Sequence, residues 1–412
     1  MIILVTGATG LIGSRLVEAL LAQGHEVIGV ARESARLKAL SIRTRTVSVD
    51  FHDATEVMDW WPLLYGVDVV INTVGLRHER RAHHFRNVHV RAPRALFKAC
   101  VLAGVRRVIH LSSLGADPSS HSALLASKAA AEANLLKLPL DGVVVQPSLV
   151  FALDAPMIRW LMGLASLPRL PVPAGGRQTL QPIHLQDLVA CLVRLATSEA
   201  YARRIIRLAG PRPWRLHDAL ATLRRAMRMR PVASLSVPTW IVRTTAALGS
   251  RLRWPFNQDT WRLIETSPST EGSITRTLLG HPAKDLDQFI ATGEAEGARS
   301  LSAWVWQRPL LQAAMAAFWL GQMVGLWPAA SGLPRTLADW LGGALALGAA
   351  TLAIGSMRQR RRWWWTLQAL AISMLLVAAW AGWAPSEGLL SSLWAAGPAL
   401  AVLWILGDRA SD

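Results

Sequence analysis

Cysteine is almost absent from this 412-residue sequence, which contains only Cys100 and Cys191. Both cysteines lie in apolar stretches with helical spacing, and neither has a further cysteine or a histidine at the spacing of a metal-binding set. We therefore expect two buried thiols rather than a disulfide. The same spacing argument predicts no metal site.

Acidic residues are also scarce, with 27 Asp and Glu against 44 Lys and Arg, and the formal net charge is +17. Such an excess is typical of nucleic-acid-binding proteins, but no zinc-finger spacing, helix-turn-helix signal or aromatic RNA-binding motif accompanies it. The sequence therefore argues against a nucleic-acid partner. A basic domain beside an anionic membrane surface accounts for the charge, because Lys and Arg near a membrane are attracted to that surface.

Charge is nearly missing from the last quarter of the chain, since only seven charged residues occur between 309 and 407. Long apolar stretches fill this region instead. Each is close to the 20 or so residues that cross a hydrocarbon core of about 30 Å. The sequence thus predicts a soluble part followed by four membrane-spanning helices, near 309–327, 337–357, 363–383 and 388–407.

The connections between these stretches predict an orientation in the bilayer. A cluster of arginines at 358–362 separates the second and third stretches, and the run Trp363–Trp365 follows it directly, as in an interfacial aromatic belt. The positive-inside rule places the cluster, both termini and the soluble part in the cytoplasm. We therefore expect a multi-pass protein of a bacterial inner membrane, without a signal peptide because no basic leader precedes the first strand.

The sequence begins MIILVTGATGLIGSRLVEALLAQGHEVIGVAR, the pattern of a strand, a glycine turn, an amphipathic helix and a second strand. Gly7 permits the tight turn, Gly10 lets the backbone approach a pyrophosphate, and Gly13 allows close packing of helix and strand. The helix N-terminus supplies free N–H groups for the anion. The context predicts a dinucleotide site. Its expected contacts include the residues between these glycines, Thr9, Leu11 and Ile12.

The residue at the end of the second strand predicts which dinucleotide binds. An NAD-preferring site usually has Asp or Glu about 20 residues after the glycines, where it binds the ribose 2′-hydroxyl. This chain has Arg32 there, with Arg36 and Lys38 following and only Glu33 as a nearby acid. Because a guanidinium suits a 2′-phosphate, the sequence favours NADP(H) over NAD(H).

Strand patterns continue to alternate with helical ones up to about residue 151, at 46–51, 67–75, 105–113 and 143–151. This alternation predicts an α/β fold, a Rossmann-type doubly wound parallel sheet with helices on both faces. Ligands of such sheets bind at the carboxyl ends of the strands. The residues expected there are Asp50, which could accept from an adenine amino group, together with Asn72, Thr73, Val74, Gly75, Pro147 and Ser148.

The motifs TGATGLIG, INTVG, HLSSLGAD through SKAAAE, QPSLVF and LPVPAGGRQTLQPIHLQDL together resemble a known family over residues 1–210. They are similar to the atypical extended short-chain dehydrogenases related to the nucleotide-binding accessory subunit of respiratory complex I. The resemblance implies a tightly held NADP(H) that is structural rather than turned over. It also places His184 and Asp187 beside the substrate pocket, where a histidine is more often structural than catalytic.

The resemblance further implies a Ser, Tyr and Lys set, in which Tyr transfers the substrate proton and a Lys four residues later lowers the pKa of that Tyr and holds the nicotinamide ribose. Lys128 is present, and Ser112 or Ser113 can take the role of the Ser. The position four residues before Lys128 is Leu124, which has no titratable proton and cannot act as a general acid. The chain has only two tyrosines, both outside the motif, Tyr65 and Tyr201.

Two interpretations of Leu124 stay open. In the first, the domain binds NADP(H), with Lys128 on the ribose, and performs no hydride chemistry. In the second, another donor replaces the tyrosine: His121, His78, His84 or a serine-bound water. The first is favoured, because loss of a positioned general acid typically costs about 10²- to 10⁴-fold in rate.

The sequence therefore predicts three regions: an NADP(H)-binding domain at 1–210, a helical connecting region at 211–300 and a four-helix membrane domain at 301–412. The last resembles the DoxX-like domains of membrane-bound oxidoreductase systems, which suggests a quinone or a respiratory complex as partner. The predicted function is a membrane-anchored nucleotide-binding accessory or sensing component. The alternatives are a membrane-attached NADPH-dependent reductase or epimerase for a quinone, isoprenoid or lipid-linked substrate, and a purely structural protein without nucleotide.

Overall fold

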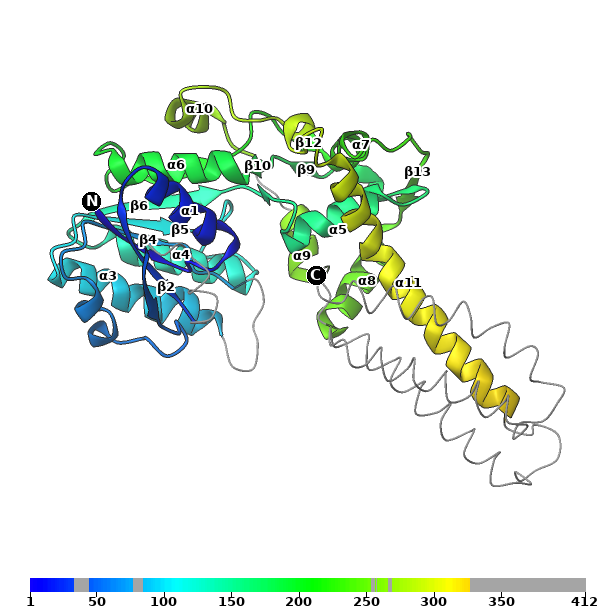
Figure 1. The fold of residues 1–412 in the computed structure, drawn as a ribbon, viewed down its shortest axis with the longest axis horizontal. Helices are drawn as coiled ribbons and strands as arrows, with labels where there is room; N and C mark the ends of the chain where they lie inside the picture. Colours follow the sequence, from blue (N-terminus) through cyan, green and yellow to red (C-terminus); the bar gives the residue numbers. More distant parts are fainter. Residues whose placement is uncertain (33–43, 77–83, 253–255, 257, 266–268, 327–412) are drawn as a thin grey trace. The chain divides into compact units, whose positions relative to one another are not determined.

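The computed structural model describes residues 1–32, 44–76, 84–252, 256, 258–265 and 269–326. The chain divides into two compact units, Met1–Ser302 and Ala303–Asp412. A seven-stranded sheet forms the centre of the first unit (Figure 1). The strands are β1 Ile2–Thr6, β2 Glu26–Ala31, β3 Thr44–Ser48, β4 Val69–Asn72, β5 Arg107–Leu111, β6 Asp141–Pro147 and β11 Ile205–Leu208.

All neighbouring strands of this sheet run parallel, in the order β11-β6-β5-β4-β1-β2-β3. The chain builds outward from β1 to β3 and then returns to place β4 on the other side of β1. This reversal is the topological switch point at which open α/β sheets bind ligands. The predicted Rossmann-type α/β fold is confirmed.

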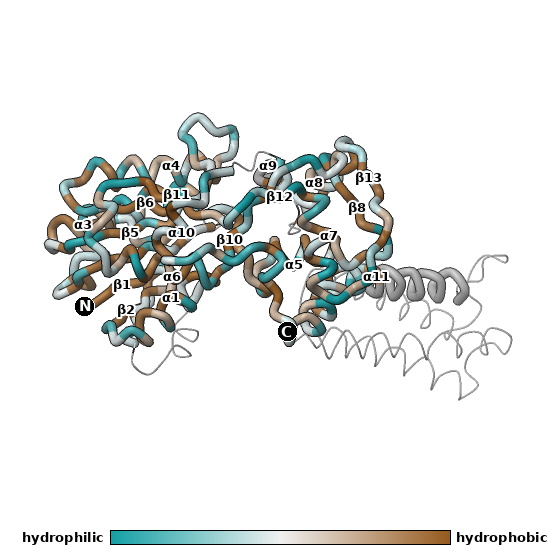
Figure 2. The backbone as a smooth tube through the Cα atoms, turned by 90° about the horizontal axis from the view of Figure 1, so that it is seen from above, coloured by the Kyte–Doolittle hydropathy of each residue, from teal (hydrophilic) through white to brown (hydrophobic). Residues whose placement is uncertain are grey.

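Helices cover both faces of the sheet (Figure 1). Residues Ile3 and Val5 of β1 pack with α1 Leu11–Ala22 and α6 Leu185–Thr197, whereas Leu4 packs with α3 Ala92–Leu102 and α4 Ala123–Leu136. Because alternate side chains enter two separate cores, the strands are hydrophobic along their length rather than at every second residue. The strands near the centre of the sheet are accordingly coloured as hydrophobic in Figure 2.

Beyond β6 the chain forms smaller elements that share the core of the α1 and α6 face. Short strands pair as β10 with β7, β12 with β9 and β13 with β8. Residues 211–302 belong to the same compact unit as the sheet. The strands are β7 Val150–Phe151, β8 Leu170–Pro173, β9 Thr179–Leu180, β10 Ile183–His184, β12 Trp214–Arg215 and β13 Ser234–Val237. The α-helices are α5 Pro156–Ala165, α7 Leu216–Ala226, α8 Thr239–Leu252, α9 Gln258–Glu265, α10 Ser273–Leu279 and α11 Ala295–Leu326. Short 3₁₀ helices lie at η1 Val57–Asp59, η2 Trp61–Leu63, η4 Ala174–Gly176 and η5 Leu286–Gln288, and a π-helix lies at η3 Arg86–Arg91.

Within the described residues, no helix combines the length and hydropathy needed to cross a membrane. The predicted span near 309–327 falls largely on α11, whose side chains beyond Leu310 are outside the description. The other three predicted spans and the arginine cluster at 358–362 also lie outside the described residues. The membrane domain therefore stays a prediction. Cys100 and Cys191 are buried free thiols, as expected.

Candidate nucleotide-binding site

The glycine turn joins β1 to α1 at the switch point. Gly7 has a φ of +74°, in the left-handed region that favours glycine, and its N–H donates to the Val30 carbonyl at 2.8 Å. A Cβ built on Gly13 would lie 2.1 Å from the Gly7 carbonyl oxygen, so only glycine allows α1 to pack this close to the turn. The helix begins after Gly10, and no side chain caps it and no acid occupies its first turn. Its N-terminus is thus free to bind an anion.

A cavity of about 170 Å³ opens beside this turn. It brings together the ends of β1, β2 and β4 and the segment after β3. Residues predicted to bind the cofactor line it: Gly7, Thr9, Gly10, Arg32, Asp50, Thr73, Val74 and Gly75. The apolar part of the lining was not predicted from the sequence: Val30, Ala31, Val49, Phe51, Leu76 and Val88. These residues lie within or next to elements whose ends were predicted to bind ligand, which is the signal that could have identified them.

Asn72 lies behind the cavity rather than in its lining. Its side chain is fully buried, and its Oδ1 accepts from the Thr6 hydroxyl at 2.7 Å and from the Val74 N–H at 3.1 Å. Its amide Nδ2 donates to His110 Nδ1 at 3.1 Å. Asn72 thus fixes the backbone at Val74, and Val74 in turn lines the cavity.

Lys128 extends from α4 and lies beside Gly75 in the loop after β4, although it is not among the residues that line the cavity. Its Nζ donates to the Leu111 carbonyl at 3.0 Å, and it is 3.1 Å from the position that a Cβ on Gly75 would take. Burial lowers the pKa of Lys128 to about 8, and the nearby Glu132 carboxylate opposes the shift. The Glu132 carboxylate accepts from Gln146 Nε2 at 2.9 and 3.0 Å, and burial raises its pKa.

The position of the expected tyrosine is occupied by a buried Leu124, which is 8% exposed in the first turn of α4. Ser112 and Ser113 follow β5 directly, and Ser112 is buried. Tyr65 precedes β4 and Tyr201 precedes β11, so both lie towards the amino ends of parallel strands, at the edge of the sheet away from the nucleotide cavity. Neither tyrosine therefore replaces the side chain that was expected at position 124.

His89, which was not predicted from the sequence, is linked to this position through Ser127. Its Nε2 accepts from the Leu76 N–H at 2.8 Å, so its Nδ1 carries the hydrogen and donates to the Ser127 hydroxyl at 2.9 Å. Ser127 donates in turn to the Leu124 carbonyl at 2.8 Å. Burial, with the charge of Lys128, lowers the pKa of His89 to about 2. His89 is therefore neutral at physiological pH and has no extra proton to give.

Four other histidines were candidates from the sequence. His121 is exposed before α4, His84 is exposed with its ring 6.3 Å from that of His52, and His78 lies outside the described residues. His184 caps α6, where its Nδ1 accepts from the Gln186 N–H at 3.3 Å, and burial lowers its pKa. This is the structural role that the sequence favoured for His184. Asp187 accepts from the Lys284 N–H at 2.8 Å.

The residues at this edge fit a dinucleotide. A single added Cβ would fill the space between the glycines, and the α1 N-terminus is uncapped. The buried Ser148 hydroxyl after β6 has no hydrogen-bond partner in the described part of the chain. Pro147, which was also predicted to contact the cofactor, ends β6 beside Ser148. Arg36 and Lys38 lie outside the described residues. The fold and site define a Rossmann-type nucleotide-binding protein.

Comparison with known proteins defines the class further. Residues 3–131 match the profile of the NAD dependent epimerase/dehydratase family. The chain is 26% identical over 255 residues to the mitochondrial NADH-ubiquinone oxidoreductase 40 kDa subunit of Neurospora crassa, a match that covers 61% of this chain and 67% of the relative. It is 27% identical over 315 residues to NADH dehydrogenase [ubiquinone] 1 alpha subcomplex subunit 9 of Arabidopsis thaliana, covering 70% and 78%.

Solved structures show the same fold. A Bacillus cereus UDP-glucuronic acid 4-epimerase bound to UDP-glucuronic acid and NAD superimposes with a TM-score of 0.53 at 18% identity, covering 74% of this chain and 100% of that one. An NADPH-dependent quinone oxidoreductase of Escherichia coli gives 0.55 at 18% identity, covering 70% and 98%. Residues 3–131 thus match the NAD dependent epimerase/dehydratase family, and the chain is distantly similar to the 40 kDa complex I subunit over 61% of its length.

The buried Lys128 predicts a pH dependence of stability. Between its pKa of about 8 in the folded protein and the ordinary 10.5, the unfolded chain binds a proton that the folded chain does not, so stability rises with pH in this window. In Lys128→Met this contribution is absent. We expect the Tm of the wild type, relative to that of the variant, to rise by about 5 °C between pH 7.5 and 10. Tryptophan fluorescence melts of both full chains measure it, and parallel Tm curves would show that Lys128 is not titrating there.

Proposed function

We propose that this protein is a membrane-anchored NADP(H)-binding component that holds its nucleotide without turning it over, and that it serves as an accessory or sensing part of a respiratory or quinone-linked system. The observation that carries the proposal is the buried Leu124 four residues before Lys128. The lysine that would hold the ribose is kept and the proton donor is lost. The relatives named as complex I subunits support the accessory role.

The chemistry of the site is limited by which side chains can move a proton. Bound nucleotide would supply a hydride, while Gly7, Gly10 and Gly13 would position the pyrophosphate and Lys128 the ribose. Leu124 has no proton to transfer, and His89 is neutral because burial and the charge of Lys128 lower its pKa to about 2. The alternative of an NADPH-dependent reductase for a hydrophobic substrate is supported by the retention of Lys128 with Ser112 and Ser113 after β5.

The membrane part of the proposal rests on the sequence. Four apolar stretches at 309–407 and the arginine cluster at 358–362 support a four-helix anchor in a bacterial inner membrane, with both termini and the nucleotide domain in the cytoplasm. Because this placement would hold the nucleotide domain at the bilayer, the proposed partner is a lipid-soluble molecule such as a quinone. Nucleotide that stayed bound during purification would argue against a purely structural protein, and a test for substrate-dependent oxidation of NADPH would separate the accessory role from the reductase.

The proposed preference for NADP(H) is tested by reversing one charge. Arg32 is exposed and lines the cavity together with Asp50. In Arg32→Glu a carboxylate would repel a 2′-phosphate and accept from a 2′-hydroxyl, so we expect the ratio of NADPH to NADH affinity to fall by about 100-fold. Arg45→Glu is the matched control, because Arg45 is exposed on β3 and does not line the cavity. Unchanged NADPH affinity in Arg32→Glu, measured by calorimetry, would rule out the assignment.

A further inference from the structure

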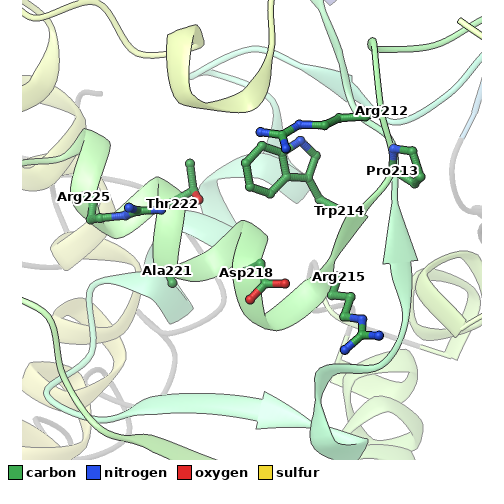
Figure 3. Close-up of a pocket in the computed structure, with 8 residues that line it drawn as sticks. All are labelled: Arg212, Pro213, Trp214, Arg215, Asp218, Ala221, Thr222 and Arg225. Atoms are coloured by element: carbon green, nitrogen blue, oxygen red, sulfur yellow. Dashed lines mark hydrogen bonds between the residues drawn. The ribbon is translucent and has the colours of Figure 1, made fainter.

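A second cavity, of about 430 Å³, lies between β12 and α7, and none of its lining residues lines the nucleotide cavity. Figure 3 shows its side chains, with Arg215 and Arg225 extending from the two ends of α7 and Arg212 lying over Trp214. Asp218 is its one acidic residue, so the walls carry three guanidinium groups against one carboxylate. The lining is Arg212, Pro213, Trp214, Arg215, Asp218, Ala221, Thr222 and Arg225.

The wall formed by Arg212 and Trp214 is held in place by Asp285. One Asp285 oxygen accepts from Arg212 Nε at 2.7 Å, and the other accepts from Trp214 Nε1 at 2.8 Å. The Arg212 guanidinium carbon also lies 4.1 Å from the centroid of the Trp214 ring, a cation–π contact. Because the bond to Asp285 uses Nε, no hydrogen bond from the described residues occupies the two terminal amino groups of Arg212, and these can bind a ligand. Asp285 neutralises one of the three arginines, which leaves a net excess of one positive charge around the cavity.

The opposite wall is formed by α7. The Thr222 side chain is 3% exposed, and its hydroxyl accepts from Arg225 Nη2 at 3.0 Å, so Thr222 directs this guanidinium and can still donate its own hydrogen. Arg215 is exposed at the N-cap of α7, where the positive end of the helix dipole adds to the field of the arginines. Asp218 has a partner in His217, at 3.0 Å.

From this arrangement we propose that the cavity between β12 and α7 binds the phosphate group of a phosphate ester. Guanidinium groups on both walls offer more donors than the two oxygens of a carboxylate can accept, and they suit the three or more acceptor oxygens of a phosphate. The volume is within the roughly 300–1,000 Å³ of small-molecule sites and exceeds what a free phosphate ion fills. The phosphate therefore belongs to a larger molecule, either a soluble ester or the head group of an anionic phospholipid.

The test uses the full chain in a neutral detergent with two probes. Calorimetric titration with sn-glycerol 3-phosphate measures binding of a soluble ester, and native mass spectrometry after mixing with phosphatidylglycerol and phosphatidylcholine measures retention of an anionic over a zwitterionic lipid. Wild-type protein is expected to bind at least one phosphate probe. Binding confined to phosphatidylglycerol identifies the source as lipid, and binding of glycerol phosphate identifies a soluble ester. Failure to bind either probe overturns the proposal.

Variants locate the binding in this cavity. Arg215→Gln with Arg225→Gln is expected to weaken binding by about tenfold or more, because hydrogen bonds to charged groups contribute substantially. The matched control is Arg94→Gln with Arg276→Gln, which removes the same charge from exposed positions on α3 and α10. Asp218→Asn removes the one repelling carboxylate and is expected to tighten binding, a gain that misfolding would not produce. Equal binding in the two double variants, or no tightening in Asp218→Asn, contradicts the proposal.

Discussion

Gly13→Ala is expected to lower the affinity for nucleotide by about 100-fold or more and to lower the Tm by about 5 °C. The added Cβ would lie 2.1 Å from the Gly7 carbonyl oxygen and 2.8 Å from its carbon, and both are backbone atoms that no rotamer change can move. Either α1 shifts away from β1 or the glycine turn opens, and both changes displace the N–H groups that would face a pyrophosphate. Calorimetric titration with NADPH and a fluorescence melt measure the two effects.

Gly297→Ala provides the control for this substitution. Gly297 lies in the first turn of α11, and a Cβ there would have no heavy atom within 4 Å outside its own helix. Replacing a helical glycine by alanine stabilises the helix by up to about 1 kcal/mol, so this variant should bind nucleotide normally and melt no earlier than the wild type. If Gly13→Ala behaved in the same way as Gly297→Ala, the close packing of α1 on the turn would not matter for binding.

Leu124→Tyr is expected to raise the rate of NADPH oxidation by a quinone analogue by about 10²-fold or more. Position 124 lies one helical turn before Lys128, so the two side chains project from the same face of α4. A phenol there would have a buried cationic amine next to it, which lowers the phenol pKa and favours proton transfer. Absorbance at the NADPH band, recorded with the quinone in excess, measures the rate.

Leu124→Phe separates the effect of the hydroxyl from that of the ring. This variant places an aromatic ring of nearly the same size as that of tyrosine at position 124 but has no hydroxyl proton to transfer. We therefore expect its rate of NADPH oxidation to equal that of the wild type. A further control, Leu124→Tyr with Lys128→Met, should lose most of the gain, because the phenol would then lack its cationic neighbour. A wild-type protein that already oxidises NADPH as fast as Leu124→Tyr would show that another donor does the work of the tyrosine.

The part of the fold that could be predicted from sequence is the part determined by local pattern. The glycines at 7, 10 and 13 stand between a strand and a helix, and this spacing was sufficient to locate the turn, the uncapped helix and the cavity beside them. Hydrophobic runs predicted the strands, and the parallel order explains why Asp50 and Gly75 line one cavity although they are far apart in the chain.

The contacts that complete the site could not be predicted in this way. His89 and Ser127 are 38 residues apart, and their hydrogen bond requires η3 and α4 to pack together. Nothing near His89 in the sequence indicates that its Nε2 meets the Leu76 N–H. Asn72 was expected among the cofactor contacts because it ends a strand, but its buried amide instead links Thr6, Val74 and His110.

The cavity between β12 and α7 depends on a longer-range contact still. Asp285 lies 73 residues from Arg212 and 71 from Trp214, and its carboxylate holds both. In the sequence, these arginines are part of a general excess of basic residues, which we attributed to a nearby membrane surface. Only the fold shows that three of these arginines line the same cavity.

The most direct test of the account is mass spectrometry of the nucleotide released from the purified full chain, followed by a time course of its oxidation state after a quinone analogue is added. The account predicts NADPH at about one per chain that stays reduced for hours with the quinone present, because Leu124 cannot transfer a proton and the histidine beside it, His89, is neutral. Rapid conversion to NADP⁺ would contradict it and would identify the protein as a working reductase.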